Sequence, residues 1–419
     1  AVRSANTLIT NGIFNAHKII FDDFISKSFG LTLLIKLITE GFYMTKSMVA
    51  AFIKSETVLV CAWVLAAISA FAIPPDKEYI GYINTDTIFL LFSLMAIVSG
   101  LKSSNFLSRV GAFLISKVKT KRQIEAILIM LCFFSSMIIT NDVSLITFVP
   151  LSIEVLRSSK MENRIIPVIT AQTIAANLGS MSTPVGNPQN IYIYSSYSLS
   201  VTDFISVMLP YTSLSFLLLA AFVFIGKNVR VKKDGMPKTE DINIKSTVFY
   251  MSLFAVCILS VIRILPDAAS FLIVLVFMLI FDRKNIRKVD YSLLLTFIGF
   301  FIFTGNIGRM EFFSGFLKSA INGKEVITSV IASQVISNVP AAILLSKFTQ
   351  NWGALMAGVN IGGLGTLIAS MASLISYKYI SVEYPEKRLK YLIYFTVINI
   401  IFLAALMALY FILHLSGPI

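Results

Sequence analysis

Long segments without a charged residue recur along almost the whole chain, and they constrain its fold more than any other feature. Examples are residues 57–74, 165–202 and 391–418. An uncharged apolar segment of about 20 residues has the length of a helix that crosses a bilayer. The 419 residues are 56% hydrophobic and only 14% charged, which leaves too little polar surface for a soluble globule. The sequence therefore predicts an all-α, polytopic membrane protein.

The net charge of +13 originates in the loops between these segments. Lys and Arg gather at 102–125, 227–245 and 282–290, whereas 74–86 and 195–203 carry few of them. Short loops rich in Lys and Arg face the cytoplasm. We therefore predict a multi-pass protein of the prokaryotic inner (plasma) membrane with a cytoplasmic N-terminus. Membrane orientation accounts for the basic loops, so no nucleic-acid partner is predicted.

The apolar segment 126–153 does not fit a single crossing. Its 28 residues are too many for one perpendicular helix and too few for two full ones. Both flanks are basic, so the segment is expected to enter from the cytoplasm, turn, and return. The turn falls at Thr140, Asn141 and Asp142. Backbone at such a turn must face protein or a watery cavity, because lipid offers its free groups no partner.

A second segment, 326–346, predicts another hairpin with Ser337 and Asn338 at its centre. Each hairpin is followed by the pattern N-(I/L)-G-x-x-x-T, since residues 177–183 read NLGSMST and residues 360–366 read NIGGLGT. Gly clustered inside an apolar segment indicates an unwound helix with free backbone groups. The order of hairpin and broken helix therefore occurs once in each half.

The topology count gives the two halves opposite orientations in the membrane. We predict an N-terminal amphipathic or extraneous segment (1–50), a first repeat (51–226), a cytoplasmic linker (227–245) and a second repeat (246–419). Within the first repeat, 105–119 has apolar residues at helical spacing and predicts an interfacial helix. Two inverted repeats, each with a re-entrant hairpin and a broken transmembrane helix, are typical of secondary transporters.

A carboxylate at the first tip is costly, at about 2.5 to 3.5 kcal/mol in the middle of an apolar segment. A bound proton or a neighbouring cation removes this cost. Asp142, the Asn141 amide and the Thr140 hydroxyl offer the oxygen ligands that hard cations prefer. We therefore expect Na+ or H+ as the coupling ion, with Asn141 and Asp142 as the Na+ candidates, and no other cofactor. The alternative is that Asp142 only fixes the turn.

Four stretches resemble the ion transporter superfamily in the expected order: TNDVSLITFVP, NLGSMSTPVGNPQN, SNVPAAILL and GVNIGGLGTLIASMASL. This superfamily includes arsenite permeases, one group of sodium/proton antiporters, citrate transporters and divalent anion/sodium symporters. The similarity covers about residues 50–419. It implies two inverted repeats, alternating access, cations between each tip and the adjacent break, and substrate between the tips. The second tip departs from the symporter pattern, because Val339 supplies no side-chain oxygen.

The candidate site residues lie at the tips and breaks. The coupling-ion candidates are Thr140, Asn141, Asp142, Asn177, Gly179, Ser337, Asn338, Asn360 and Gly362. The substrate candidates are Ser182, Thr183, Gly186, Asn187, Val339, Pro340, Gly365 and Thr366. For Asn177 and Asn360 the alternative is a purely interhelical hydrogen-bonding role.

The sequence predicts an ion-coupled (Na+ or H+) secondary active transporter of a small inorganic or organic anion. The alternative is a sodium/proton antiporter, which the buried acid at the first tip favours. An enzyme is not expected, because His17 and His414 stand alone near the ends and the three cysteines show no ligand spacing. The expected partners are the small ion or anion and the lipid bilayer, and the sequence leaves open whether the protein forms a homodimer.

Overall fold

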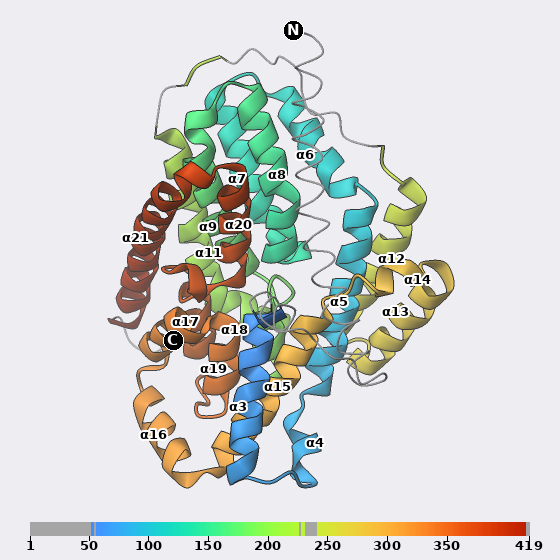
Figure 1. Cartoon of the computed structure of the whole chain (residues 1–419), viewed down its shortest axis with the longest axis vertical. Coiled ribbons are helices and arrows are strands. Elements are labelled where there is room, and N and C mark those ends of the chain that lie inside the picture. The colour runs from blue at the N-terminus through green and yellow to red at the C-terminus, as the bar shows by residue number, and fades with distance from the viewer. Residues whose placement is uncertain (1–51, 54–55, 226–227, 231–240, 416–419) are drawn as a thin grey trace. The chain divides into compact units, whose positions relative to one another are not determined.

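The computed structural model describes residues 52–53, 56–225, 228–230 and 241–415 (Figure 1). These residues form helices and no strand; an isolated bridge joins Thr120 to Arg230. The predicted segment 1–50 lies outside the described residues, as does 231–240 of the predicted linker.

Six helices in this part of the chain are long and apolar enough to cross a membrane, which confirms an all-α, multi-pass membrane protein. They are α5 (Thr85–Ser103), α7 (Lys121–Ile139), α11 (Val201–Phe224), α12 (Ile244–Val261), α15 (Tyr291–Arg309) and the stretch Pro385–His414, most of which is α21 (Arg388–Leu415). Shorter helices outside the hairpins and breaks are α3 (Thr57–Ala72), α4 (Glu78–Tyr82), α6 (Phe106–Lys117), α13 (Asp267–Phe281), α14 (Arg283–Ile286) and α16 (Glu311–Ile321).

The chain divides into two compact units. The first unit comprises residues up to 83 together with 278–306, and the second comprises 84–277 with 307–419. Inside the first unit, Asn306 donates hydrogen bonds to Ser69 (3.0 Å) and to the Tyr79 hydroxyl (2.9 Å), which satisfies a buried amide between helices. Both predicted hairpins and both predicted breaks lie in the second unit, so the candidate site is described within it.

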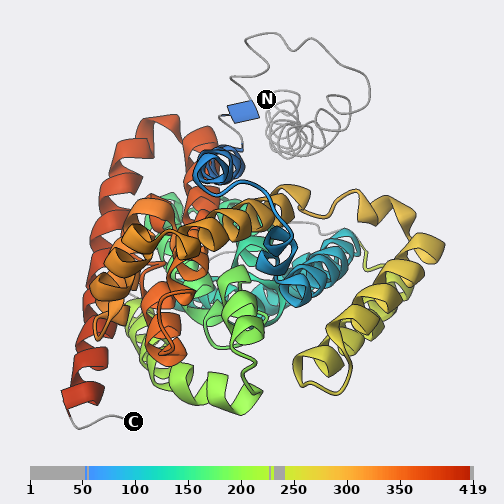
Figure 2. The same cartoon turned by 90° about the horizontal axis from the view of Figure 1, so that it is seen from below.

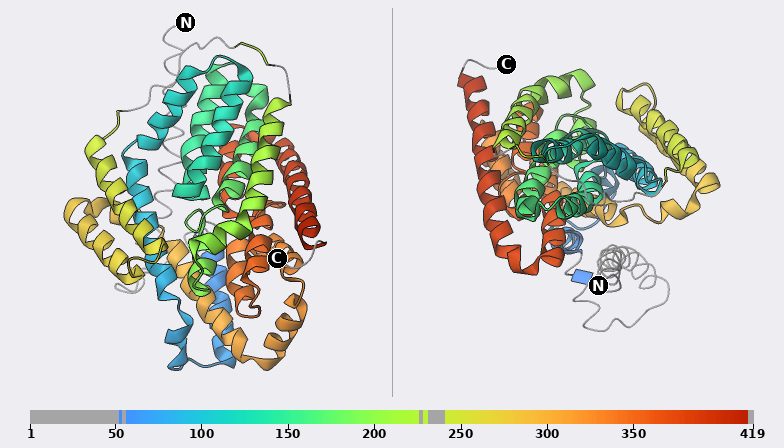
Figure 3. Two further views of the ribbon diagram at one scale, coloured as in Figure 1. Left: turned by 180° about the vertical axis from the view of Figure 1, so that it is seen from behind. Right: turned by 90° about the horizontal axis from the view of Figure 1, so that it is seen from above.

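The first predicted hairpin is present as α7 and α8 (Asn141–Ser158), joined by the single residue Thr140 (Figure 3). The helices run antiparallel, because the hydroxyls of Ser135 and Ser144 are 2.7 Å apart and Arg164, beyond the end of α8, bonds Glu125 near the start of α7. With 19 and 18 residues, each helix is about 27 to 29 Å long, close to the hydrocarbon thickness of about 30 Å. The arms are therefore longer than the charge-free length predicts.

Each arm of the first hairpin includes a glutamate that borders the charge-free segment 126–153, and one of the two, Glu125, is paired. Glu125 lies inside α7 with its side chain 5% exposed, and Arg164 donates to both of its carboxylate oxygens at 2.7 and 2.8 Å. These hydrogen bonds raise the pKa of the Arg164 guanidinium above its ordinary value, which keeps it charged. The pairing makes it possible for Glu125 to be buried, whereas α8 runs past Glu154, which is exposed; charged residues therefore do not mark the ends of either helix.

The second hairpin consists of α17 (Glu325–Ile336) and α18 (Asn338–Ser346), joined by Ser337. The two tips share one unusual backbone conformation, since Thr140 has φ 71° and ψ 151° and Ser337 has φ 73° and ψ 155°. Non-glycine residues rarely adopt such a conformation, which costs about 1 to 3 kcal/mol and is concentrated at functional sites. Both turns lie where the sequence predicts, and they share one strained backbone conformation.

The two broken helices follow their hairpins, as predicted, and can be traced by colour in Figures 1 and 2. In the first, α9 (Ile165–Ser180) is separated from α10 (Pro188–Ser196) by the break 181–187. In the second, α19 (Trp352–Ile361) is separated from α20 (Met371–Glu383) by the break 362–370. Nearly every residue of α9 is buried, so this helix forms the core of the second unit. The opposite membrane orientation of the halves stays a prediction.

A short amphipathic helix precedes each hairpin. The predicted helix at 105–119 is present as α6, and its counterpart α16 was not predicted from the sequence. Phe312 and Phe316 of α16 are 80% and 65% exposed. An apolar face of this kind suits the membrane interface.

The glycine of each repeated heptapeptide lies where two helices approach most closely. A Cβ on Gly179 would stand 2.0 Å from the Phe133 carbonyl oxygen and 2.5 Å from the Ser136 hydroxyl. A Cβ on Gly362 would stand 2.7 Å from the Ser333 hydroxyl. Ser136 and Ser333 each lie four residues before a tip. The same Gly-to-Ser contact therefore packs α9 on α7 and α19 on α17.

Replacing these glycines is expected to destabilise the protein in a defined order. Gly179→Ala meets backbone and should cost at least 1 to 3 kcal/mol through overpacking, because the Phe133 carbonyl cannot rotate away. Gly362→Ala meets the Ser333 hydroxyl at 2.7 Å and the Gly358 carbonyl at 2.8 Å, so its overlap is smaller and it should cost less. Gly353→Ala, whose Cβ would meet Val207 at an ordinary 3.6 Å, is the control. Thermal unfolding of the purified variants checks the order, and equal melting temperatures for Gly179→Ala and Gly353→Ala would contradict the packing.

Candidate transport site

The first tip lies directly against the first break. The Asn141 side chain donates a hydrogen bond to Asn177 Oδ1 (3.1 Å), and the Asn141 backbone amide donates to the Gly186 carbonyl (3.1 Å). From the other side, the Thr183 hydroxyl donates to the Met137 carbonyl at 2.6 Å. Free backbone groups of the tip and the break therefore satisfy each other, as a turn at membrane depth requires.

The second tip contacts the second break in a related way. The Ser337 hydroxyl lies 3.4 Å from the Ala369 carbonyl, and Ala369 has the same offset from its repeated asparagine as Gly186 in the first half. In addition, the Gln334 amide donates to the carbonyls of Gly362 (2.8 Å) and Leu364 (2.9 Å). A side chain thus supplies much of the hydrogen bonding to this break.

Reciprocal hydrogen bonds join each break to the end of the helix that precedes the other break. Asn187 donates to Asn360 Oδ1 (3.1 Å), and Ser370 donates to Asn177 Oδ1 (3.0 Å). Asn187 and Ser370 each lie ten positions after the repeated asparagine of their own half, so the same contact is made in both directions. Asn360 also donates to Asn190 Oδ1 at 2.7 Å. The breaks of both halves therefore meet in one polar cluster.

This cluster is buried, so its hydrogen bonds contribute to the stability of the protein. Asn141, Asn177, Asn187, Asn190 and Asn360 are each at most 5% exposed. An unpaired buried amide costs about 1 to 3 kcal/mol. The interhelical hydrogen bonds that the sequence left open for Asn177 and Asn360 are therefore present. Asn177 bonds the tip of its own half and Ser370 of the opposite half, and Asn360 bonds Asn187 and Asn190 of the opposite half.

One donor of the cluster, Asn177 Nδ2, has no hydrogen-bond partner among the described residues. Exchanging the oxygen and nitrogen of this amide would break two hydrogen bonds, because Asn177 Oδ1 already accepts from Asn141 and Ser370. A buried unsatisfied donor at such a place is rare and calls for a functional or structural reason. It offers a hydrogen bond to an acceptor that enters the cluster.

The two tips differ in charge. Asp142 lies half-buried in the first turn of α8, and its backbone amide donates to Asn141 Oδ1 at 2.9 Å. The matching residue of α18 is Val339, which is buried. Four helices begin at the tips and at the ends of the breaks, namely α8, α10, α18 and α20. Helix N-termini carry partial positive charge and favour anions.

The structure does not bring every predicted residue into this cluster. Ser182 donates to Thr212 of α11 at 3.2 Å, outside the cluster. A Cβ on Gly365, which has φ +105°, would stand 2.4 Å from Gln334 Oε1, so this position requires glycine for backbone reasons. Pro340 is buried in the first turn of α18, behind the second tip.

Three residues of the cluster were missed by sequence reasoning: Asn190, Ser370 and Gln334. Ser370 could have been found by matching positions ten residues after each repeated asparagine. Asn190 lies in the PVGNPQN stretch that follows the first break and is completely buried. Gln334 has no counterpart in the first half, where Met137 occupies the equivalent place, so repeat matching does not reveal it.

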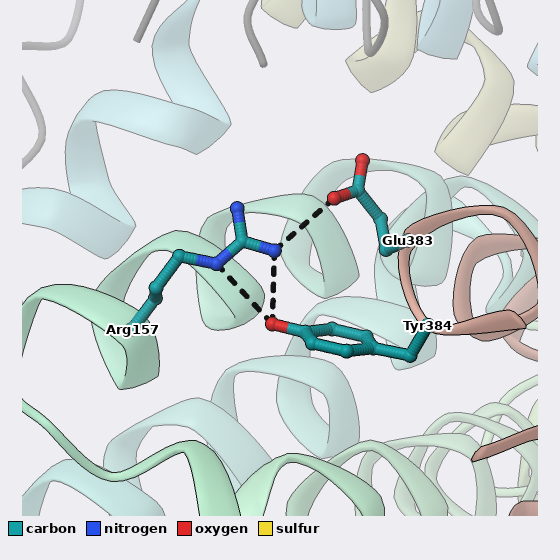
Figure 4. Close-up of polar contacts among 3 residues, drawn as sticks. All are labelled: Arg157, Glu383 and Tyr384. Atoms are coloured by element: carbon teal, nitrogen blue, oxygen red, sulfur yellow. Dashed lines mark hydrogen bonds and ion pairs between the residues drawn. The ribbon is translucent and has the colours of Figure 1, made fainter. Parts of the chain in front are cut away.

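A second polar cluster joins the first hairpin to the second broken helix at the ends remote from the tips (Figure 4). Arg157 at the end of α8 donates to the Tyr384 hydroxyl (2.9 and 3.2 Å) and to Glu383 (3.2 Å). The Arg157 side chain is 46% exposed, so its pairing with Glu383 contributes at most about 1 kcal/mol. No group of His, Cys, Asp and Glu suited to a metal occurs in the described part of the chain.

Hairpins whose tips lie on broken helices, inside a bundle of apolar helices, are typical of membrane transporters. Residues 37–357 match the family described as citrate transporter, and the chain belongs to that family. An uncharacterised transporter of Methanocaldococcus jannaschii is 35% identical over 303 residues, covering 72% of this chain and 82% of that protein. These matches confirm the resemblance stated from the motifs.

Two further relatives match over most of their own length. The inner membrane protein YbiR of Escherichia coli K12 is 30% identical over 317 residues, covering 74% of this chain and 84% of that protein. An uncharacterised transporter of Mycobacterium tuberculosis is 23% identical over 366 residues, covering 77% of this chain and 85% of that protein.

Asn360→Ala is expected to lower the free energy of unfolding by about 1 to 3 kcal/mol, because Asn190 Oδ1 loses its donor and Asn187 Nδ2 keeps only the Ser180 hydroxyl as acceptor. Asn399→Ala is the matched control: Asn399 is also buried, but it donates only to Phe395 in its own helix. Chemical unfolding of both purified variants checks the difference. Equal losses would show that these hydrogen bonds between the halves add no stability.

Proposed function

We propose that this protein is a cation-coupled secondary active transporter that moves a small inorganic or organic anion by alternating access, with Na+ or H+ as the driving ion. The observation that carries the proposal is the meeting of two repeat-related helix breaks, with one acidic tip and one neutral tip. Membership of a transporter family gives the coarser class, and the chemistry of the cluster supports the finer one.

The coupling ion is assigned to the first tip. Asp142 contributes a negative charge, and Thr140 and Asn141 contribute oxygens next to it. Asn177 and Gly179 belong to the last turn of α9, whose C-terminal end is negative and favours a cation. In the second half, Ser337, Asn338, Asn360 and Gly362 occupy the corresponding places without an acid. A proton on Asp142 would serve the same purpose as Na+ at this tip.

The anion is assigned to the region between the breaks. Neither the tips nor the breaks contain Lys or Arg, so the anion must be held by helix N-termini and neutral donors. The unpartnered Nδ2 of Asn177 is one such donor. Further contributions are assigned to residues of the breaks and tips: Ser182, Thr183, Gly186, Asn187, Val339, Pro340, Gly365 and Thr366. The family description, citrate transporter, supports a carboxylate-bearing or similar oxyanion substrate.

Electrostatics couples the two ligands. Two like charges about 4 Å apart repel by about 4 kcal/mol at an effective dielectric constant of about 20. An anion that enters beside ionised Asp142 meets this repulsion, and a cation or proton at Asp142 removes it. Binding of the cation therefore favours binding of the anion, and by linkage the anion favours the cation to the same extent. Such coupling is what a symporter needs.

A sodium/proton antiporter is the second candidate. Its specific support is that the tips and breaks hold a single acid, Asp142, and no basic residue. In this case Na+ and H+ compete for the carboxylate, and no anion is moved. For localisation, the name of the Escherichia coli relative, an inner membrane protein, supports the prokaryotic inner membrane.

Asp142→Asn is expected to abolish Na+-dependent stabilisation while the protein still folds. A ligand present at 100 times its Kd stabilises the folded state by about 2.7 kcal/mol. The parent protein should therefore melt at a higher temperature in NaCl than in choline chloride, and Asp142→Asn should melt equally in both. Glu386→Gln, at an exposed acid, serves as control and should behave as the parent. A variant that keeps the Na+ shift would remove Asp142 from the ion site.

Transport by reconstituted vesicles distinguishes the two candidate functions. The symporter requires that an inward Na+ or proton gradient drives uptake of an anion, with citrate, sulfate and arsenite as the first anions tested. The antiporter requires that a Na+ gradient moves protons in the absence of any of these anions. Proton movement that depends on Na+ alone would refute the symporter.

A further inference from the structure

Gln334 places its side-chain amide on carbonyl oxygens of the second break. Its Nε2 donates to the carbonyls of Gly362 (2.8 Å) and Leu364 (2.9 Å), and the Val330 carbonyl lies at 3.3 Å. Its Oε1 accepts from the backbone amide of Thr366 at 2.9 Å. The position of this amide is therefore fixed on both sides.

Carbonyls that converge at the end of a half-helix form a site for a cation. Such carbonyls coordinate Na+ in transporters with broken helices, because the helix end is negative and the oxygens have lost their helical partners. Here α19 ends at Ile361, and the two carbonyls bonded by Gln334 follow directly. An NH2 group supplies two donors to them without any ion. The amide thus provides the positive electrostatic end that a bound cation would otherwise provide.

The first half has the opposite chemistry. Three residues before its tip stands Met137, which has no donor, whereas Gln334 stands three residues before the second tip. Two residues after its tip stands Asp142, whereas Val339 stands at the matching place in the second half. At these two matched positions the first half has an acid and no amide, and the second half has an amide and no acid.

We propose that the amide of Gln334 permanently fills the cation position of the second half, so that the protein takes a single coupling cation, at the first half. The part that concerns the first half rests on the proposed function. The part that concerns Gln334 rests on the second break alone.

Gln334→Glu is the decisive variant. It replaces the two donors with acceptors and adds a negative charge beside the Gly362 and Leu364 carbonyls, which then require a cation. Binding of radiolabelled Na+ to the purified full chain should rise by one ion per chain relative to the parent. Gln350→Glu introduces the same charge at an exposed position after α18 and should leave the count unchanged.

Gln334→Met tests the same position without adding charge. It leaves the two carbonyls without donors, so this variant should melt at a lower temperature than the parent in choline chloride. NaCl should raise the melting temperature of this variant by more than it raises that of the parent. Met137→Gln places an amide at the matching position of the first half and should remove Na+ binding there.

The outcomes separate this inference from the proposed function. One Na+ in the parent and two in Gln334→Glu support both. No Na+ in the parent and one in Gln334→Glu support the inference and indicate that the first half binds a proton as its coupling ion. Two Na+ in the parent, or no gain in folded Gln334→Glu, overturn the inference whatever the first half binds. A Gln334→Met variant that NaCl does not stabilise beyond the parent also overturns it.

Discussion

The structure depends on one constraint: backbone groups freed at membrane depth must find partners inside the protein. The two halves satisfy this constraint by forming hydrogen bonds within and between them. Each tip bonds the break of its own half, and the last residue of each break bonds the repeated asparagine at the end of the helix before the other break. The hairpins and broken helices can exist in an apolar bundle because their polar groups converge in one place.

These hydrogen bonds also explain the strained and closely packed positions. Thr140 and Ser337 adopt the same unfavourable backbone conformation, and the contacts of the tips with the breaks hold both in place. Gly179 and Gly362 let the helices before each break approach the hairpin arms within the distance that those bonds require. The two halves therefore repeat in geometry, while Asp142 and Gln334 make them differ in charge. In the proposed function, this difference couples the ion to the substrate.

Much of this arrangement could be predicted from the sequence because its signals are local. Asp142 in an apolar segment and the repeated N-(I/L)-G-x-x-x-T pattern gave both tips and both breaks. The lengths of α7 and α8 could not be read in the same way, because each helix includes a glutamate at the border of the charge-free segment. Asn190 was not predicted because its partner Asn360 lies in the opposite half, and Gln334 was not predicted because Met137 stands at the matching place of the first half. Pairing across the halves is a property of tertiary structure, which single-sequence patterns do not contain.

The central claim, that each break bonds the helix end before the other break directly, is tested most directly by a double-mutant cycle between Asn187 and Asn360. Unfolding is measured for Asn187→Ala, Asn360→Ala and the double variant. Direct bonding predicts that the double variant loses less than the sum of the single variants, by about 1 kcal/mol or more. Additive losses, within the roughly 0.3 to 0.5 kcal/mol found for independent sites, would contradict it.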